Sequence, residues 1–332
     1  MLENKYQLNT EDKLGTDYSP EIKAFWDKHA HIEPFQSVHG GQINTIHIKT
    51  GHQQAIVISQ GRNESVLKYK EIAFDLYQQG YDVFLIDHRG QGFSSRLGGD
   101  AHRGHVERFE HYISDFTAFV DSLQLTQHYQ AQFLFCHSMG GAISALYLEQ
   151  QAHPFNAVVF FSPMLSINLR GFSPFSAKLL SYVSDKLTRT VSNVACYAPK
   201  SVIYSPTPFE KNQLTHSPRR YASAFSTFEQ VIETQLGGPT MRWVYESLKA
   251  TEKAIAQAHK ITIPTLIIQS GADTIVTSFG QQAFFDNLSK NVDKALLTIE
   301  QAKHELLIEA DQYRLPALTA ALDFINTHKK VT

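Results

Sequence analysis

The residues with the clearest chemical potential are the six at positions 136–141, Cys136-His137-Ser138-Met139-Gly140-Gly141. They follow an apolar run at 133–135 and precede alternating small and apolar residues at 142–147, which predicts a strand, a very tight turn and a helix. A serine at the apex of such a turn presents its hydroxyl to a substrate, provided that the residues two before and two after it are small, as in the G-x-S-x-G nucleophile elbow. Gly140 meets this requirement, and Cys136, in the place of the first glycine, is small enough to meet it. We therefore predict that Ser138 is a nucleophile, against the alternative of a Ser/Gly-rich loop without chemical function.

A serine hydroxyl needs a base that removes its proton, and the base needs an acid that orients it. In nucleophile-elbow enzymes the acid and then the histidine follow the serine along the chain, each after a late strand. Asp273 directly follows the apolar run 265–269, and His304 follows the last such run, at 295–299. Alone, either could be an ordinary turn or surface residue, but their order and their places predict the triad Ser138, Asp273 and His304.

The negatively charged tetrahedral intermediate of such a reaction needs hydrogen-bond donors that are fixed in advance. One donor is expected to be the backbone N–H of the residue after the nucleophile, Met139, and the other to come from the loop after the first central strand. That loop is 59–64, where Gly61 permits a tight turn and the backbone N–H of Arg62 is the best candidate. The alternative is an ordinary strand-to-helix loop. For His137, which is too near Ser138 in sequence to act as its base, and for the other histidines of motifs, His88, His102 and His105, we predict structural roles.

The elements that must position these groups can be read from hydrophobic patterning. Short apolar runs typical of strands covered on both faces lie at 55–58, 83–86, 133–135, 157–161, 265–268 and 295–299, with helical patterns between them at 69–79, 109–123 and 141–150. This alternation predicts an α/β fold with a mostly parallel central sheet flanked by helices. Ahead of it, alternating residues at 33–38 and 43–49 predict an antiparallel hairpin.

The strand–helix alternation is interrupted at 163–260. This segment has helical periodicity at 175–187, 221–235 and 240–258 and no clear strand pattern. An excursion of that length between two strands predicts an inserted helical cap, so that the core consists of residues 1–162 and 261–332. Within the cap, Leu179, Leu180, Val183 and Leu187 recur at helical spacing, and such a stripe more often packs on a core than faces a ligand.

Composition excludes several classes of protein. A formal net charge of -2 gives no electrostatic support for nucleic-acid binding. The two cysteines, Cys136 and Cys196, do not make a disulfide framework and favour a reducing compartment. The polar stretch 1–20 lacks the apolar core of a secretory signal, no apolar run reaches membrane-spanning length, and the sixteen histidines form no zinc motif. These features predict a cytoplasmic enzyme without a metal.

The motif segments together resemble a known family, the α/β-hydrolases of the monoacylglycerol lipase and lysophospholipase branch, which includes the bacterial inner-membrane-associated lysophospholipases. The resemblance runs from about Phe25 to Phe324, and the segments that carry it are 60–65, 87–94, the elbow 136–141, 102–106, 214–217, 237–240 and 304–305. Two departures stand out: relatives often carry His where this chain has Gln60, and Gly where it has Cys136. Neither removes a backbone donor or a member of the triad.

The resemblance implies an α/β-hydrolase fold with an inserted helical cap, and a serine hydrolase that needs no organic cofactor or metal. It implies hydrolysis of a lysophospholipid or monoacylglycerol, that is, a lipid or ester with one acyl chain. Alternatives left open are a general short-chain carboxylesterase, a peptidase of the same superfamily, or a non-catalytic binding protein on this fold. Further expectations are that Phe172 and Phe175 line an acyl channel or touch lipid at its mouth, and that the cap contacts the inner face of the cytoplasmic membrane. Arg219 and Arg220 are expected either to meet an anionic head group or to be solvated surface arginines. The sequence leaves head group, acyl length and oligomeric state open.

Overall fold

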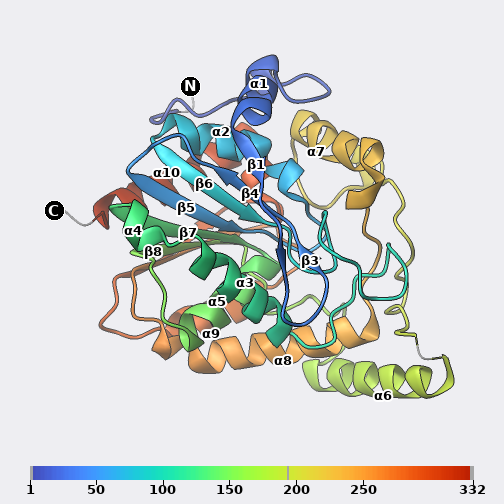
Figure 1. The fold of residues 1–332 in the computed structure, drawn as a ribbon. Helices are drawn as coiled ribbons and strands as arrows, with labels where there is room; N and C mark the ends of the chain where they lie inside the picture. Colours follow the sequence, from blue (N-terminus) through green and yellow to red (C-terminus); the bar gives the residue numbers. More distant parts are fainter. Residues whose placement is uncertain (1–2, 193, 330–332) are drawn as a thin grey trace.

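The computed structural model describes residues 3–192 and 194–329, and within them its central element is an eight-stranded sheet (Figure 1). The strand order is β1-β4-β6-β5-β7-β8-β9-β10. The six strands from β5 to β10 run parallel, while β4 is antiparallel to both β1 and β6. The strands are β1 (Ala30–Ile32), β4 (Thr45–Ile48), β5 (Gln54–Ser59), β6 (Tyr81–Ile86), β7 (Ala131–His137), β8 (Ala157–Phe161), β9 (Thr265–Ser270) and β10 (Lys294–Ile299).

All six apolar runs of the sequence therefore form parallel strands, and the predicted mostly parallel sheet is confirmed. The central strands are buried along their full length, except for half-buried Gln54 at the start of β5, because helices cover both faces. The predicted hairpin also forms, since β2 (Phe35–Gln36) pairs antiparallel with β3 (Gln42–Ile43), and the chain then continues into β4, which pairs with β1.

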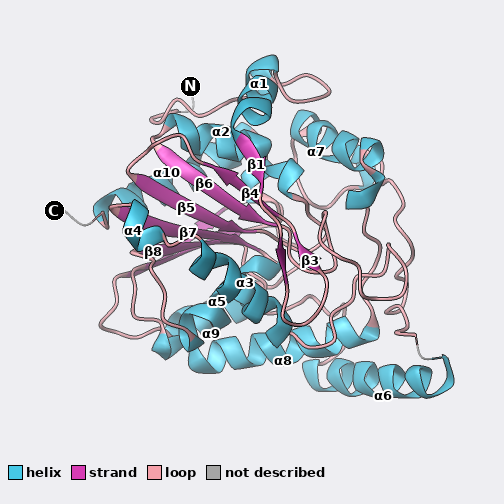
Figure 2. Ribbon diagram, viewed as in Figure 1, coloured by secondary structure: helices cyan, strands magenta, loops and turns pink. Residues whose placement is uncertain are grey.

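Two hydrophobic cores lie on opposite faces of the sheet because side chains alternate along each strand. One core contains Val57 and Leu134 and is covered by α3 (Glu110–Ser122), α5 (Met139–Gln150), α8 (Met241–Gln257) and α9 (Ser278–Asn287). The other contains Ile56 and Phe133 and is covered by α1 (Pro20–His29), α2 (Lys70–Gln78) and α10 (Asp311–Thr327). Figure 2 shows this arrangement of the strands between helices, and a short helix, α4 (Leu125–His128), precedes β7.

The chain between β8 and β9 carries α6 (Pro174–Ser192), α7 (Pro218–Gln230) and α8. In Figure 1, α6 lies beside α8 at the lower right, whereas α7 lies at the upper right, near α1 and α2. α8 packs on α5 and α9 and places Trp243, Ala250 and Ala254 in the first core. The extent of a cap at 163–260 stays a prediction, and α8 contributes to the core as well.

Helix α6 packs on the protein through the opposite face from the one that we predicted. The stripe that was predicted to pack on the core is exposed: Leu179 is 53% exposed and Leu187 is 64% exposed. Instead α6 buries Ser181 and Asp185, and Asp185 forms ion pairs with Arg189 (3.0 Å) and Arg242 of α8 (3.7 Å). Because the polar side of the helix satisfies these contacts, its apolar side faces outward.

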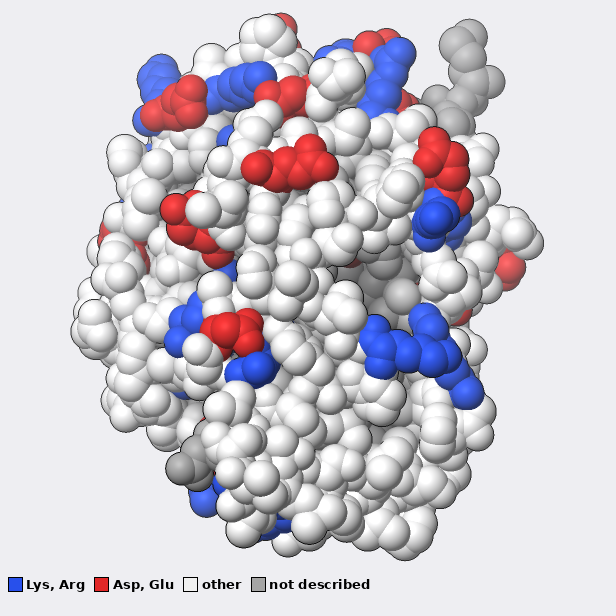
Figure 3. Space-filling model, turned by 90° about the vertical axis from the view of Figure 1, so that its right-hand side faces the viewer, with Lys and Arg blue, Asp and Glu red and all other residues white. Residues whose placement is uncertain are grey.

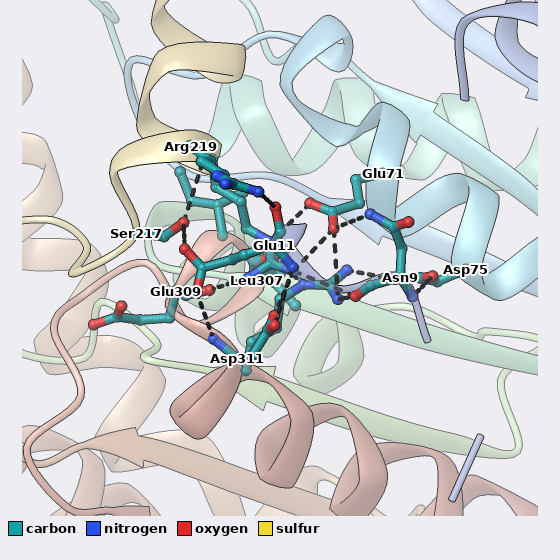
Figure 4. Close-up of polar contacts among 12 residues, drawn as sticks. Asn9, Glu11, Glu71, Asp75, Ser217, Arg219, Leu307, Glu309 and Asp311 are labelled. Atoms are coloured by element: carbon teal, nitrogen blue, oxygen red, sulfur yellow. Dashed lines mark hydrogen bonds and ion pairs between the residues drawn. The ribbon is translucent and has the colours of Figure 1, made fainter. Parts of the chain in front are cut away.

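Helix α7 is fixed to the core by a buried polar network (Figure 4). Arg220 is 1% exposed and binds Glu71 of α2 (2.9 Å) and Asp311 at the start of α10 (2.8 Å), while Arg314 binds Asp75 (2.5 Å). The main-chain oxygen of Asn9 accepts bonds from both guanidinium groups. The expectation that Arg220 meets a lipid head group is therefore wrong, because burial with two carboxylates removes it from the surface.

Candidate active site

Ser138 occupies the sharp turn between β7 and α5, as the elbow motif predicts. Its backbone has φ +49° and ψ -117°, a region that a non-glycine residue rarely adopts, and which the surrounding packing must impose. A methyl group at Gly140 would overlap the carbonyl oxygen of Ser59, which shows how closely α5 approaches β5. Cys136 fits in place of the usual glycine, because its thiol is buried and directed toward the carbonyl oxygen of Val159 (3.4 Å).

The structure brings the three predicted triad residues together. His304 Nδ1 donates to Asp273 Oδ2 (2.7 Å), and His304 Nε2 accepts from the hydroxyl of Ser138 (2.9 Å). The other carboxylate oxygen of Asp273 accepts from the backbone N–H groups of Ile275 (2.8 Å) and Val276 (3.1 Å), which fixes the plane of the carboxylate. The side chains of Asp273 and His304 are 6% and 4% exposed, so solvent competes little for these bonds.

The two predicted oxyanion donors lie at neighbouring strand ends. Ser59, the last residue of β5, lies opposite Cys136 of β7, so the loop with Arg62 adjoins the elbow. Met139 is the first residue of α5, where a backbone N–H has no partner within the helix. The backbone N–H of Arg62 also makes no hydrogen bond to any of the described residues. Gln60 of the same loop donates to Asp87 (2.7 Å).

A buried cluster that the sequence did not reveal joins the three loops of the site. It consists of Glu64, Lys68, Tyr69, His137 and Glu305, here called the Glu64 cluster. Glu64 accepts from the backbone N–H of Gly61 (2.5 Å), the hydroxyl of Tyr69 (2.6 Å) and the ammonium of Lys68 (2.5 Å), and lies 3.1 Å from His137 Nδ1. His137 Nε2 donates to the carbonyl oxygen of His304 (3.2 Å). The oxyanion loop, the elbow and the base loop are thus held by one set of side chains.

Electrostatics keep His137 and Glu64 ionised in this cluster, whereas burial and Glu64 raise the pKa of Tyr69, whose hydroxyl stays protonated. Burial opposes the charged form of His137, but Glu64 and Glu305 outweigh it and raise the pKa of His137 to about 9. Burial likewise opposes ionisation of Glu64, and Lys68 and His137 outweigh it and hold the pKa of Glu64 well below its usual value. Glu64, His137 and Glu305 also have the spacing of metal ligands, but the Lys68 ammonium lies 2.5 Å from Glu64 and 2.6 Å from Glu305, where a cation would sit.

The remaining motif histidines lie outside the triad. His88 is fully buried, its ring nitrogen Nε2 lies 3.0 Å from the hydroxyl of Ser59, and burial lowers its pKa to about 3, so it is neutral. His105 contacts Thr240 (3.1 Å), beside the backbone bond from Gly104 to Gly238 of the following segment (3.1 Å). Both have the structural character that the sequence analysis assigned to them.

A cavity of about 320 Å³ opens above Ser138 and His304. Much of its lining is apolar, and the apolar side chains come from Met164, Ile167, Leu214, Phe225, Phe228, Pro239, Trp243, Ile275 and Val276. Charged side chains also reach it, namely Arg62, Lys68 and Glu305, of which the last two are paired with each other. The arrangement can activate a hydroxyl next to a hydrophobic chamber, which suits attack on an acyl group.

Comparison with known proteins gives concordant results. A family model described as "Serine aminopeptidase, S33" matches residues 50–311. Lysophospholipase L2 of Escherichia coli (strain K12) is 36% identical over 281 residues, which covers 83% of this chain and 82% of that protein. Monoglyceride lipase of Homo sapiens is 27% identical over 261 residues, 77% of each chain. A soluble variant of the Saccharomyces cerevisiae monoglyceride lipase, in complex with a substrate analog, superposes with a TM-score of 0.69 at 16% identity, covering 91% of this chain and 96% of that one. The expected α/β-hydrolase fold is confirmed.

Proposed function

Because this chain belongs to the α/β-hydrolase family that the serine aminopeptidase S33 model describes, and is similar over most of its length to Lysophospholipase L2, we propose that it hydrolyses the carboxylic ester of a single-chain lipid. The substrate is a lysophospholipid or a monoacylglycerol. The observation that carries the proposal is the hydrogen-bonded series Asp273–His304–Ser138, which opens onto an apolar cavity.

The arrangement of Asp273, His304 and Ser138 supports the following reaction. His304 Nε2 takes the proton of Ser138 as the hydroxyl oxygen attacks the ester carbonyl carbon, and Asp273 stabilises the imidazolium that results. The N–H groups of Arg62 and Met139 bind the oxyanion. The intermediate collapses when His304 gives its proton to the leaving alkoxide, which departs as the glycerol-containing alcohol. A water molecule then attacks the acyl-serine with His304 as base again, and the fatty acid leaves.

The cavity favours a lipid ester over a peptide. An aminopeptidase needs a carboxylate that binds the free amino group of its substrate. Among the described residues that line the cavity, Glu305 alone has a carboxylate, and that carboxylate is already paired with the ammonium of Lys68. A long acyl chain, by contrast, gains from the apolar side chains that surround Ser138, at about 25 cal/mol per Å² of apolar surface buried.

The test is hydrolysis of lysophospholipids, monoacylglycerols, p-nitrophenyl esters of graded acyl length and an aminoacyl amide, by wild type and Ser138→Ala. We expect turnover of the single-chain lipids, covalent labelling by a fluorophosphonate, and loss of both in the variant. Labelling without turnover of any ester would favour the binding-protein alternative. Preference for acetyl esters would favour a short-chain esterase, and cleavage of the amide a peptidase.

We also propose that the outward face of α6 contacts the membrane that supplies the substrate, at the inner surface of the cytoplasmic membrane. Phe172 is 60% exposed, Phe175 is 72% exposed and Val191 is 89% exposed, and all lie along this helix or just before it. The lower part of the face in Figure 3, where α6 lies, is largely free of charged side chains. In the described residues no helix has the length and apolarity needed to cross a bilayer. The contact that we propose is a peripheral one.

The membrane proposal is tested by Phe172→Ser and Phe175→Ser, with Ile32→Ser, an equally exposed apolar residue of β1 (67%), as the control. The two phenylalanine variants are expected to lose vesicle binding and activity on a long-chain lysophospholipid in vesicles, and to keep activity on a soluble acetyl ester. Unchanged vesicle binding would exclude α6 as the contact, and equal loss on both substrates would indicate damage to the fold.

A further inference from the structure

A second cavity of about 510 Å³ adjoins the one that contains Ser138. Five residues line both cavities, namely Arg62, Asn63, Leu214, Phe225 and Ile275. The rest of its lining comes from residues within 200–213 and 236–238, which connect α6, α7 and α8, and from Tyr221 of α7. Figure 3 shows a hollow on this side of the molecule with basic side chains along its edge.

The charges of the second cavity are all of one sign. Lys200, Lys211 and Arg62 line it, and no aspartate or glutamate does so among the described residues. Nor does any carboxylate of the described chain lie within ion-pair distance, 4.0 Å, of these three groups. Lys200 and Lys211 are exposed at the cavity, and Arg62 is half-buried. None of the three has a carboxylate partner of the kind that Arg220 has in Glu71 and Arg314 has in Asp75.

Arg62 is the least exposed of the three. Its Nη2 donates to the carbonyl oxygen of Gly237 (2.7 Å) and its guanidinium lies over the ring of Trp243 (5.2 Å), yet its Nε is buried without a partner. Burial lowers the pKa of Arg62 to about 10, which means that the surroundings disfavour the charge. An anion bound in the cavity would offset that penalty, since charge-assisted hydrogen bonds are stronger in a partly buried site.

The two cavities also differ in polarity, as the two ends of a single-chain lipid do. The cavity at Ser138 is mainly apolar, whereas the second one combines apolar residues such as Val202, Ile203 and Leu236 with lysines, hydroxyl groups and amides, including Ser201, Tyr204 and Gln213. Both meet at Arg62, whose backbone N–H is the proposed oxyanion donor. An ester bound at Ser138 can therefore extend its acyl chain along apolar side chains and its polar part toward the cations.

We propose that the second cavity, through Lys200, Lys211 and the side chain of Arg62, binds the phosphate group of a lysophospholipid and so selects phospholipid-derived substrates over monoacylglycerols. This inference rests on the proposed function, because it concerns the leaving group of the same ester. A monoacylglycerol carries a neutral glycerol there, which gains nothing from the three cations. A lysophospholipid places a negatively charged phosphodiester at the same point, a few bonds from the ester that Ser138 attacks.

The experiment compares kcat/KM for two substrates with the same dodecanoyl chain, lysophosphatidylglycerol and monoacylglycerol, both below their critical micelle concentrations. For the double variant Lys200→Ala/Lys211→Ala we expect the ratio of the two values to fall by about tenfold, because each exposed pair is worth up to about fivefold. Lys290→Ala, an exposed lysine before β10, removes the same charge far from the cavity and is expected to leave the ratio unchanged. Raising the salt from about 0.05 M to about 0.5 M is expected to lower the ratio in wild type but not in the double variant.

Inhibitors separate a head-group site from a site for free phosphate. Glycerol phosphate is expected to compete with lysophosphatidylglycerol in wild type, and to do so more weakly in the double variant. An unchanged ratio in the double variant would overturn the inference, as would inhibition by inorganic phosphate without inhibition by glycerol phosphate. If wild type hydrolysed neither lipid, the proposed function itself would fail, and a wild type that hydrolyses both equally would refute the selection alone.

Discussion

From the charge state of His137 we predict how the free energy of unfolding depends on pH. The pKa of this buried histidine rises from an ordinary 6.5 to about 9 in the folded protein. At about 1.4 kcal/mol per pKa unit, the protonated ring adds about 3 kcal/mol to the free energy of unfolding. Because the folded pKa is the higher one, this contribution is fully present below pH 6.5 and is lost as the pH rises through 9.

The measurement is urea-induced unfolding of wild type and His137→Gln at several pH values between 6.5 and 9.5. The difference between their free energies of unfolding is expected to shrink by about 3 kcal/mol over this range, while lysines and tyrosines that titrate in both proteins cancel. The matched control is His88→Gln, because His88 is buried and neutral, with a pKa of about 3, so its difference from wild type should not depend on pH. A difference for His137→Gln that stays constant within about 1 kcal/mol would mean that the ring is neutral and that Glu64 and Glu305 do not hold a proton there.

Three further results are expected. Ser138→Ala should abolish acyl-enzyme formation and lower the rate by several orders of magnitude, and adding Asp273→Asn should cause almost no further loss. Rates of the single and double variants on a p-nitrophenyl ester would show this, and additive losses would contradict the triad. On a soluble acetyl ester, Arg62→Ala should keep substantial activity whereas Arg62→Pro, which lacks the N–H, should lose roughly 10²–10³ in kcat; equal losses would assign the role to the side chain. Gly140→Ala should unfold or inactivate the protein because the added methyl group would overlap the backbone of Ser59. Gly15→Ala, at a position with room for a Cβ, should do neither, and thermal unfolding and activity measurements check both variants.

Much of the sheet could be predicted because its strands are buried on both faces. Such strands carry continuous apolar runs, and each of the six runs became a parallel strand. The order of the strands could not be obtained in the same way, because pairing such as that of β5 between β6 and β7 depends on contacts far apart in the sequence. The prediction for the apolar stripe on α6 was wrong for a related reason. Periodicity identifies an apolar face but does not show whether that face packs on protein or is exposed.

The triad could be predicted because Ser138, Asp273 and His304 each follow a strand at one edge of a parallel sheet. The Glu64 cluster gave no comparable signal. Glu64, Lys68 and Glu305 are charged residues of types that are usually exposed, and nothing in their spacing shows that they meet in the interior. The charges of these residues are balanced by several partners together, so the balance can be recognised only once the positions of all the partners are known. The same holds for Arg220, whose carboxylates come from two helices far away in the chain.

The buried network around Arg220 and Arg314 bears on how far the chain can be shortened. The segment that matches the family model ends at residue 311, whereas Arg314 lies beyond it and Asn9 lies well before its start at residue 50. A chain trimmed to that segment would leave the carboxylates of Glu71 and Asp75 in the interior without Arg314, and Arg220 without the main-chain oxygen of Asn9. Unpaired charges of this kind are strongly destabilising when one partner is removed. The unit that folds on its own therefore extends past both ends of the segment that matches the family model, because residues outside that segment help to fix α7 to the core.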